Sequence, residues 1–371
     1  MRILITGADG FIGANLRARL RESGAHEVIS ITRATNSEEL NDSLAVAEIV
    51  YHLAGVNRPS IEDEFLTGNY GFTQRICDTL QRARRRIPVV FASSTQATHD
   101  NPYGRSKLAA EDAVRRYGEQ TDARVFIFRL TNVFGKWARP NYNSVVATFC
   151  HNMARGLPIV VSDPSARLRL LHIDAVSDAL IRCLNAQHSE AGFCEAGPIY
   201  ETTVGEVADI IRSFQESRST LLTPHVGAGL VRVLYATFVS YLPPAEFAYT
   251  VPLYEDARGT FAEILKTPDC GQFSYFTARP GVTRGEHYHH TKTEKFVVLK
   301  GTAQFGFRHI ETGEIREVIV RGGHGQIVET IPGWAHNITN VGAEELIVML
   351  WANEIFDRSH PDTIPAKVVI Q

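Results

Sequence analysis

Several features that mark particular classes of protein are absent from this sequence. No apolar run approaches the roughly 20 residues that a membrane-spanning helix needs, and the N-terminus lacks the basic and apolar regions of a secretory signal. The five cysteines have no CxxC spacing, which favours reduced thiols over a disulfide framework. With 38 basic and 41 acidic residues, the chain has no basic excess to favour nucleic acid. We therefore expect a cytoplasmic protein that binds neither membranes nor nucleic acid.

The length and the order of the patterns predict two domains. A chain of 371 residues exceeds the usual single core, and it contains no internal repeat or low-complexity tract. Apolar strands first alternate with helical stretches, which is typical of an α/β fold with a doubly wound parallel sheet. After Pro243 and Pro244 the chain becomes rich in short strands and glycine turns, which predicts a small all-β barrel. We place the Rossmann-type domain at residues 1–246 and the barrel at residues 247–371.

The N-terminal segment predicts a dinucleotide site. An apolar strand leads into the turn TGADGFIG and then into an amphipathic helix, so that backbone N–H groups can approach a pyrophosphate at the helix N-terminus. The candidate cofactor residues in this turn are Gly7, Gly10, Phe11, Ile12 and Gly13. An NAD enzyme usually has an acid at the end of the second strand to bind the ribose, but this chain has Arg33 there. Because a guanidinium suits a 2'-phosphate, NADP(H) is favoured.

A tyrosine and a lysine at helical spacing follow a later strand. Tyr103 and Lys107 lie at i and i+4, and the preceding strand ends near Ser94. We expect the lysine ammonium to lower the pKa of the phenol, which gives a proton to a carbonyl oxygen while a hydride arrives from a nicotinamide. The serine hydroxyl orients that oxygen, and Thr95 is the alternative one residue away.

The segments TGADGFIG, HLAG, SSTQ, YGRSK and RLTNVFG resemble the extended short-chain dehydrogenase/reductase family that acts on nucleotide sugars. The similarity covers roughly the first 240 residues. It implies that Ser94, Tyr103 and Lys107 are catalytic and that Lys107 also holds the nicotinamide ribose. It further implies that Leu53 and Ala54 contact the cofactor. The implied substrate contacts are those of Asn132 to the sugar and of Arg167 and Arg169 to the nucleotide diphosphate. The alternative for the two arginines is a solvated charged loop.

Residues that would direct this domain to other reactions are missing. Family members that eliminate water usually have an Asp-Glu pair after the active-site Ser or Thr, whereas Gln96 and Ala97 stand at this place. Epimerases that recycle a bound NAD usually carry the ribose-binding acid that Arg33 replaces. The sequence therefore favours net reduction by exchangeable NADPH.

The C-terminal half carries a second candidate site, in the stretch GVTRGEHYHHTKTEKFVVLKG. Strand alternation places His287 and His289 on one face, and Glu294 and His336 can converge with them inside a barrel. Such a set suits a divalent metal, most readily zinc, with manganese, iron or nickel as alternatives. The spacing resembles the first motif of the cupins, but the second motif, around His336, is less regular, which leaves the geometry of its loop open. His290 points outward on an ideal strand and becomes a substitute ligand if the strand contains a bulge.

The role of His287 has two interpretations. The sequence Arg284-Gly285-Glu286-His287 resembles the RGxH of cupin-fold epimerases of 4-keto sugars, whose histidine removes a proton next to the ketone. A histidine that ligates a metal is not a free base, so either His289 or His290 takes more of the coordination, or Lys292 or a metal-bound hydroxide is the base.

Both halves together resemble the bifunctional epimerases and reductases of bacterial capsule and O-antigen synthesis, on the path to UDP-N-acetyl-L-fucosamine. The resemblance implies a UDP-linked 4-keto-6-deoxy amino sugar whose C3 the cupin epimerises before NADPH reduces C4, giving the L-talose configuration. It also implies a homodimer or higher homo-oligomer. One alternative is a nucleotide-sugar 4-ketoreductase with a structural or regulatory metal-binding cupin. Another is an NADP-sensing scaffold, against which the set Ser94, Tyr103 and Lys107 argues.

Overall fold

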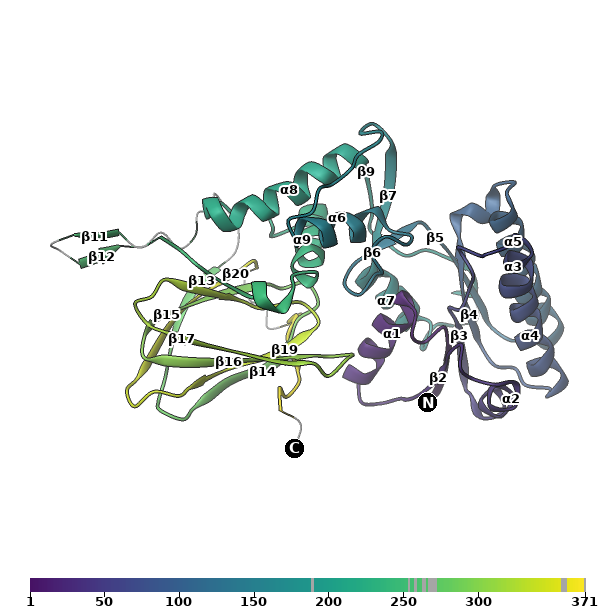
Figure 1. Cartoon of the computed structure of the whole chain (residues 1–371). Helices are drawn as coiled ribbons and strands as arrows, with labels where there is room; N and C mark the ends of the chain where they lie inside the picture. Colours follow the sequence, from purple (N-terminus) through teal and green to yellow (C-terminus); the bar gives the residue numbers. More distant parts are fainter. Residues whose placement is uncertain are drawn as a thin grey trace. The chain divides into compact units, whose positions relative to one another are not determined.

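The computed structural model describes residues 1–187, 190–252, 254–256, 259–261, 265, 272–354 and 359–369 (Figure 1). It divides into two compact units, which we describe separately. Unit 1 comprises Met1–Val133 and Arg169–Glu201, and unit 2 comprises Phe134–Leu168 and Thr202–Gln371. Cys270, one of the five cysteines, lies outside the described residues. The other four cysteines are free, and three of them are buried.

Unit 1 is built on a six-stranded sheet of order β2-β1-β3-β4-β5-β8, in which every neighbouring pair is parallel. Its strands are β1 (Arg2–Thr6), β2 (Glu27–Ile31), β3 (Ile49–His52), β4 (Val89–Ser94), β5 (Val125–Leu130) and β8 (Gly192–Cys194). Its helical segments are α1 (Phe11–Glu22), α2 (Ser37–Val46), α3 (Asp63–Phe65), η1 (Leu66–Gly71), α4 (Phe72–Arg82), η2 (Thr95–Thr98), α5 (Pro102–Thr121) and α7 (Ile173–Arg182).

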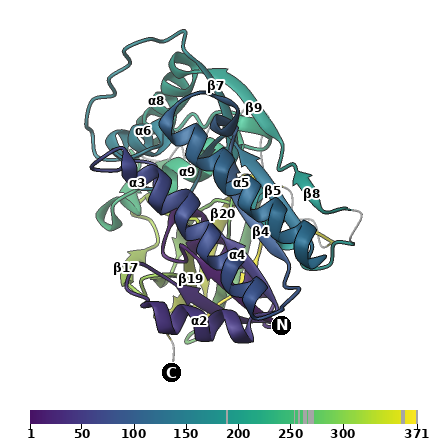
Figure 2. The ribbon, with the colours of Figure 1, turned by 90° about the vertical axis from the view of Figure 1, so that its right-hand side faces the viewer.

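Helices cover both faces of this sheet, as its strands require because they are apolar on both sides. On one face Leu16 of α1 and Leu180 of α7 join a core with the strands, and on the other face α2, α4 and α5 contribute Leu44, Leu80 and Val114 to a second core. Figure 2 shows α4 and α5 side by side on the second face. This is the doubly wound arrangement that the alternation of strands and helices predicted.

Local signals fix the start of α5, the helix that carries the candidate tyrosine and lysine. Asn101 is its N-cap, with the side-chain oxygen accepting a hydrogen bond from Gly104 N at 2.8 Å, and Pro102 occupies the first turn. Both residue types favour a helix start, since the asparagine satisfies a free N–H and the proline has none to lose. A separate three-stranded sheet has the order β6-β7-β9, with strands at Asn132–Phe134, Arg167–His172 and Ile199–Thr203.

The described residues of unit 2 form two five-stranded antiparallel sheets and three α-helices. The sheets have the orders β10-β18-β15-β20-β13 and β17-β16-β19-β14-β21, and β11 and β12 form a hairpin. The strands are β10 (Ala248–Thr250), β11 (Tyr254–Asp256), β12 (Gly259–Phe261), β13 (Gln272–Ala278), β14 (Thr283–Tyr288), β15 (Glu294–Lys300), β16 (Thr302–His309), β17 (Ile315–Arg321), β18 (Gln326–Glu329), β19 (Trp334–Asn340), β20 (Leu346–Ala352) and β21 (Ile364–Pro365). The helical segments are α6 (Val145–Met153), α8 (Val204–Thr220), α9 (Gly229–Ser240) and η4 (Pro244–Glu246).

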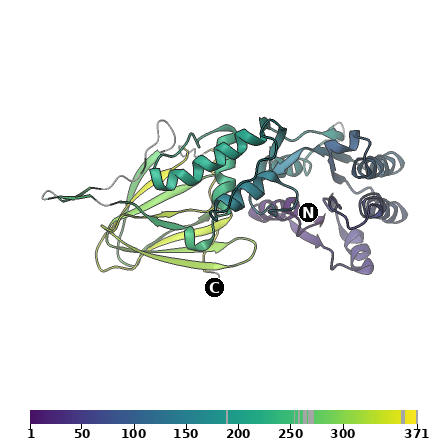
Figure 3. The same ribbon diagram turned by 45° about the horizontal axis from the view of Figure 1, so that its top comes forward.

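Aromatic side chains fill the space between the two sheets of unit 2. The ring of Phe296 on β15 lies 6.4 Å from that of Phe276 on the same sheet and 5.7 Å from that of Phe305 on the facing sheet. Helices α8 and α9 lie against the sheet that contains β15 and β18 (Figure 3), where Arg218 and Tyr235 both reach Glu329. The barrel is therefore packed against helices that precede it in the chain.

The predicted fold class is confirmed, since a Rossmann-type parallel sheet is followed by an antiparallel β domain. The boundary between residues 246 and 247 stays a prediction. None of the helices among the described residues combines the length and the apolar character that crossing a bilayer would take.

Candidate active sites

The glycine turn after β1 packs so closely that side chains would not fit. Gly7 has φ +68°, in the left-handed region that favours glycine, and a Cβ there would lie 2.8 Å from the Cα of Ala54. A Cβ on Gly13 would lie 2.2 Å from the carbonyl oxygen of Gly7. Gly10 is the N-cap of α1, with no side chain to occupy the free N–H groups of the first turn. The turn therefore offers these N–H groups to an anion, as the sequence predicted.

Arg33 lies two residues beyond β2, next to this turn. Ala8 N donates to the carbonyl oxygen of Ile31 at 3.3 Å, which holds the turn beside the end of β2. The Arg33 side chain is exposed. Its position is that of the residue that distinguishes the two cofactors in dinucleotide-binding folds, and its contact with a 2'-phosphate stays a prediction.

Ser94, Tyr103 and Lys107 come together in unit 1. Ser94 is the last residue of β4, and its hydroxyl interacts with the Tyr103 phenol, whereas Thr95 already belongs to η2. Lys107 lies one turn further along α5, buried, with Nζ donating to the carbonyl oxygen of Ala92 at 2.8 Å. The arrangement brings a phenol and a hydroxyl to one point, which is what protonation of a substrate oxygen requires.

The pKa of the Tyr103 phenol differs from the sequence-based expectation. Burial raises this pKa, and the interaction with Ser94 opposes the rise. The Lys107 ammonium donates its hydrogen bond to the carbonyl oxygen of Ala92. Burial also lowers the pKa of Lys107 to about 8, against an opposing effect of Glu111. The phenol is therefore in its protonated, proton-donating form at neutral pH.

Sequence reasoning missed the buried carboxylate of Glu111, one further turn along α5. It is fully buried and accepts hydrogen bonds from the Ser93 hydroxyl at 2.5 Å and from Arg129 Nη2 at 2.7 Å. These contacts link α5 to β4 and β5 directly beside Ser94. The available signal was the spacing i, i+4 and i+8 of Tyr103, Lys107 and Glu111 on one helical face.

The predicted sugar and diphosphate residues lie on the three-stranded sheet. Asn132 begins β6, and Arg167 and Arg169 alternate on the exposed side of β7. Arg169 Nε lies 3.6 Å from a carboxylate oxygen of Glu201, and the side chains of both residues are more than half exposed. The arginines therefore face solvent, and their role in binding a nucleotide stays a prediction.

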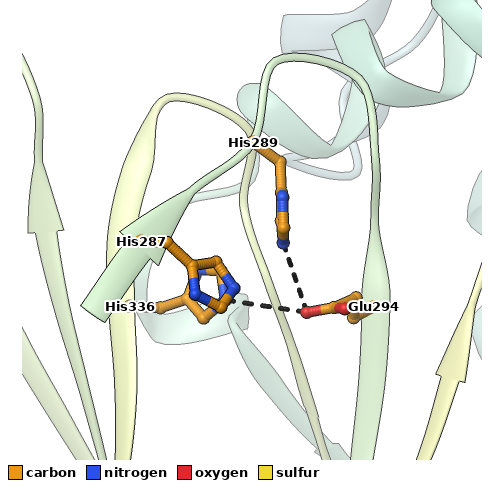
Figure 4. Close-up of side chains that lie close together, drawn as sticks. All are labelled: His287, His289, Glu294 and His336. Atoms are coloured by element: carbon orange, nitrogen blue, oxygen red, sulfur yellow. Dashed lines mark hydrogen bonds and ion pairs between the residues drawn. The ribbon is translucent and has the colours of Figure 1, made fainter. Parts of the chain in front are cut away.

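In unit 2, His287, His289, Glu294 and His336 form one cluster, drawn in Figure 4. One ligand atom from each lies within 4.8 Å of all the others. His289 Nε2 lies 3.3 Å and His336 Nε2 3.6 Å from the same Glu294 oxygen, Oε2. Three of the side chains are buried and His287 is half-buried. Three imidazoles and a carboxylate converging in this way match a divalent transition-metal site.

An irregular strand builds the cluster, rather than the simple alternation that we expected. The register of β14 against β19 shifts between Gly285 and His287, Glu286 has φ +62°, and β14 ends at Tyr288 before His289. A left-handed backbone is costly for a residue with a side chain. Here Glu286 is held by hydrogen bonds from Asn337 Nδ2 at 2.7 Å and Val368 N at 3.0 Å.

His290 is not one of the four residues of this cluster, and its role as a substitute metal ligand stays a prediction. Although buried, it lies with its ring centroid 5.4 Å from that of Tyr288, and its backbone N–H donates to Asp362 Oδ1 at 2.8 Å. The bulge falls before His287 rather than between the two later histidines.

The pKa shifts of His287, Glu294 and His336 are in the direction that metal ligation needs. Burial and the neighbouring His336 and His289 lower the pKa of His287 to about 3, and burial also lowers that of His336. Burial alone would raise the pKa of Glu294, but its contacts with His289 and His336 outweigh this and lower the pKa well below its usual value. Neutral His287 and His336 beside an ionised Glu294 fit a divalent cation.

The fold and both sites define a chain with a short-chain-dehydrogenase core joined to a cupin-like β domain. Residues 3–193 match the NAD dependent epimerase/dehydratase family, and residues 254–364 match the polysaccharide biosynthesis C-terminal domain. The chain belongs to the NAD dependent epimerase/dehydratase family, as a CapF-like member that carries this C-terminal domain.

Individual relatives agree with this assignment. A UDP-2-acetamido-2,6-beta-L-arabino-hexul-4-ose reductase of Pseudomonas aeruginosa is 50% identical over 368 residues, which cover 99% of each chain. The capsular polysaccharide assembling protein CapF from Staphylococcus aureus has a crystal structure with 40% identity and a TM-score of 0.69, covering 99% of this chain and 100% of that one. A UDP-glucuronic acid 4-epimerase from Bacillus cereus, 20% identical over 59% of this chain and 84% of its own, with a TM-score of 0.52, shares the fold alone.

Proposed function

We propose that this protein reduces the C4 ketone of a UDP-2-acetamido-2,6-dideoxy-4-hexulose with NADPH, for capsule or O-antigen synthesis. The observation that carries the proposal is the contact of Ser94 with Tyr103, one helical turn from the buried Lys107, in a chain 50% identical to a reductase of such a sugar. The preference for NADPH rests on Arg33 beside the glycine turn.

The residues of unit 1 suit the proton side of a ketone reduction. NADPH, when bound on the glycine turn, supplies the hydride. Tyr103 donates a proton to the C4 oxygen, for which the raised pKa of the phenol keeps it protonated at neutral pH. The Ser94 hydroxyl orients the same oxygen, and the ammonium of Lys107 holds the cofactor ribose. Asn132, Arg167 and Arg169 are assigned to the sugar and its diphosphate, as the sequence suggested.

We further propose that the cupin epimerises C3 before the reduction. A ketone at C4 makes the C3 hydrogen acidic, and this acidity is lost once the ketone has become an alcohol. The order of the reactions is therefore fixed by the chemistry of the substrate. Carrying both sites on one chain keeps a reactive keto sugar near its next site.

His289, Glu294 and His336 suit three-point ligation of a divalent ion, most readily zinc, because catalytic sites keep one position open for water or substrate. Such an ion, when bound, stabilises negative charge on a ketone oxygen. We assign the proton transfer at C3 to His287, since it is the half-buried member of the cluster and is neutral at neutral pH. In this proposal His289, Glu294 and His336 hold the metal ion, and His287 is the base.

Two variants of the full chain test the separation of the reactions. In heavy water without NADPH, the wild type and Tyr103→Phe should both incorporate deuterium at C3 of the 4-keto sugar, followed by NMR. Tyr103→Phe should lower NADPH oxidation by at least about 100-fold while cofactor binding persists. His287→Ala should lose the deuterium exchange but should still reduce sugar that the wild type has already epimerised.

Other outcomes would decide for the alternatives. If the wild type reduces the sugar but never exchanges its C3 hydrogen, the chain is a single-activity ketoreductase with a structural or regulatory cupin. If it binds NADPH but oxidises none with the 4-keto sugar, an NADP-sensing scaffold is favoured. We also propose a homodimer or higher homo-oligomer, which light scattering of the purified protein tests.

A further inference from the structure

The side chain of Asp362, in the segment before β21, holds the loop that follows β14. Its Oδ1 accepts from His290 N at 2.8 Å, and its Oδ2 accepts from Thr291 N and from Lys292 N, each at 2.7 Å. The Thr291 hydroxyl adds a fourth hydrogen bond at 3.1 Å. Three consecutive backbone N–H groups thus converge on one carboxylate, about 70 residues away in the chain. Hydrogen bonds to an ionised acceptor are stronger than those between neutral groups.

The same residue also contacts a member of the His/Glu cluster directly. His289 Nδ1 hydrogen-bonds the backbone carbonyl oxygen of Asp362. A carbonyl oxygen only accepts, so Nδ1 carries the hydrogen and Nε2 presents its lone pair. That Nε2 is the atom that faces Glu294 Oε2 at 3.3 Å. Asp362 therefore fixes both the orientation of the ring and the nitrogen that it offers inside the cluster.

The loop has a second, independent support that does not involve this histidine. Asn353 Oδ1 accepts from Thr293 N at 3.0 Å, and Asn353 Nδ2 donates to the carbonyl oxygen of Thr291 at 3.3 Å. Asn353 is fully buried. Like Asp362, it accepts a hydrogen bond from a main-chain N–H group of this loop. It provides a matched comparison, because Asn353→Ala removes support from the same loop but leaves the Asp362 side-chain contacts that hold the Asp362 backbone carbonyl beside His289.

We propose that Asp362 is the positioning residue of the metal site, acting through the loop at residues 290–292 and through the tautomer of His289. This inference rests on the proposed function of the cluster as a divalent-metal site. Outer residues that orient metal-binding histidines are worth about 10- to 100-fold in metal affinity. The C-terminal segment is thereby a structural part of the site, although no ligand comes from it among the described residues.

The test is zinc affinity of the full-length protein, measured by competition with a chromophoric chelator. Asp362→Ala should weaken zinc binding by about 10- to 100-fold, whereas Asn353→Ala should stay within about threefold of the wild type. Asp362→Asn keeps one acceptor oxygen for the Thr291 and Lys292 N–H groups, so it should fold even if the alanine variant does not and should show an intermediate loss. Circular dichroism verifies the fold of each variant.

The visible spectrum of the cobalt(II)-loaded protein is a readout that general loosening would not move. Asp362→Ala and Asp362→Asn should shift its bands, because the geometry of the ligand set determines them, and Asn353→Ala should leave them in place. Folded Asp362 variants that bind zinc like the wild type, or an equal loss in Asn353→Ala, would overturn the inference. If the wild type binds neither ion, the metal site itself is refuted, and the positioning role with it.

Discussion

Reductase activity should decline as pH rises, and removing the charge of Glu111 should shift this decline to lower pH. Burial lowers the pKa of Lys107 to about 8, and the Glu111 carboxylate raises it against this effect. Glu111→Gln keeps the shape of the side chain and an acceptor for the Ser93 hydroxyl, but the negative charge is gone. The Lys107 ammonium should then lose its proton at lower pH, and with it the positive charge that the cofactor ribose requires.

The size of the effect follows from Coulomb's law. Side chains one helical turn apart are separated by about 6 Å, which gives about 3 kcal/mol at an effective dielectric constant of about 20. Because Arg129 neutralises part of the Glu111 charge, we take about half of this, or about 1.4 kcal/mol, which is tenfold in the acid dissociation constant of Lys107. The pKa of Lys107 should therefore fall from about 8 to about 7.

The assay is kcat/KM for the 4-keto sugar between pH 6 and pH 9, with NADPH saturating. The charged lysine is lost as pH rises, so the variant should be about fivefold slower than the wild type at pH 8 and nearly equal to it at pH 6. Glu119→Gln, the same change at an exposed position of α5, should keep the wild-type profile. A variant that is uniformly slower at all pH values would show that Glu111 acts through structure alone and would refute the argument.

Three further predictions concern the cofactor and the packing. Arg33→Asp should raise the KM for NADPH by at least about tenfold with little change for NADH, because a charged hydrogen bond of about 1.5–3 kcal/mol is lost. Arg129→Met should lower the free energy of unfolding by about 3–5 kcal/mol in urea, since Glu111 stays buried without its cation. Gly333→Ala should lower the free energy of unfolding by about 2–4 kcal/mol, because φ is +81° and the new Cβ would lie 2.9 Å from the Trp137 ring.

Each packing prediction has a control in the same chain. Arg115→Met removes an exposed ion pair with Asp112 and should cost less than about 1 kcal/mol. At Gly313 φ is +74°, and a new Cβ would meet no atom within 4 Å. Gly313→Ala should therefore lower the free energy of unfolding only by the cost of the left-handed backbone conformation. Equal losses of unfolding free energy in Arg115→Met and Arg129→Met would contradict the buried-charge argument. Equal losses in Gly313→Ala and Gly333→Ala would exclude a role for Trp137. For Arg33, equal changes with NADPH and NADH would show that it does not contact the 2'-phosphate.

Features that depend on neighbouring residues were predictable from the sequence. The second strand expected before Arg33 is found at Glu27–Ile31, because its apolar residues stand between turn signals. Tyr103 and Lys107 lie on one helix as expected, because the neighbouring residues Asn101 and Pro102 mark the helix start. The four clustered residues of unit 2 were recognised through their resemblance to the cupin motif, although an irregular strand rather than simple alternation brings them together.

Features that depend on long-range contacts were not predictable. Lys107 donates to the carbonyl oxygen of Ala92, 15 residues earlier, and no signal near the lysine indicates this contact. The N–H of His290 donates to Asp362, 72 residues later, which likewise leaves no signal near the histidine. A residue whose partners are distant in sequence looks like any other polar loop residue until the chain is folded.

The packing of unit 2 also determines how the two reactions can be separated experimentally. Glu329 on β18 is buried with Lys295 Nζ at 2.9 Å, and it is also reached by Arg218 of α8 at 3.5 Å and by the Tyr235 hydroxyl of α9 at 3.4 Å. A cut at the proposed boundary, after residue 246, would remove Arg218 and Tyr235 and would leave the buried carboxylate with fewer partners. Breaking a buried charge network in this way costs several kcal/mol, and a lost activity in the fragment would then report instability rather than chemistry. Point variants of the full chain are therefore the sound route to assigning each reaction to its site.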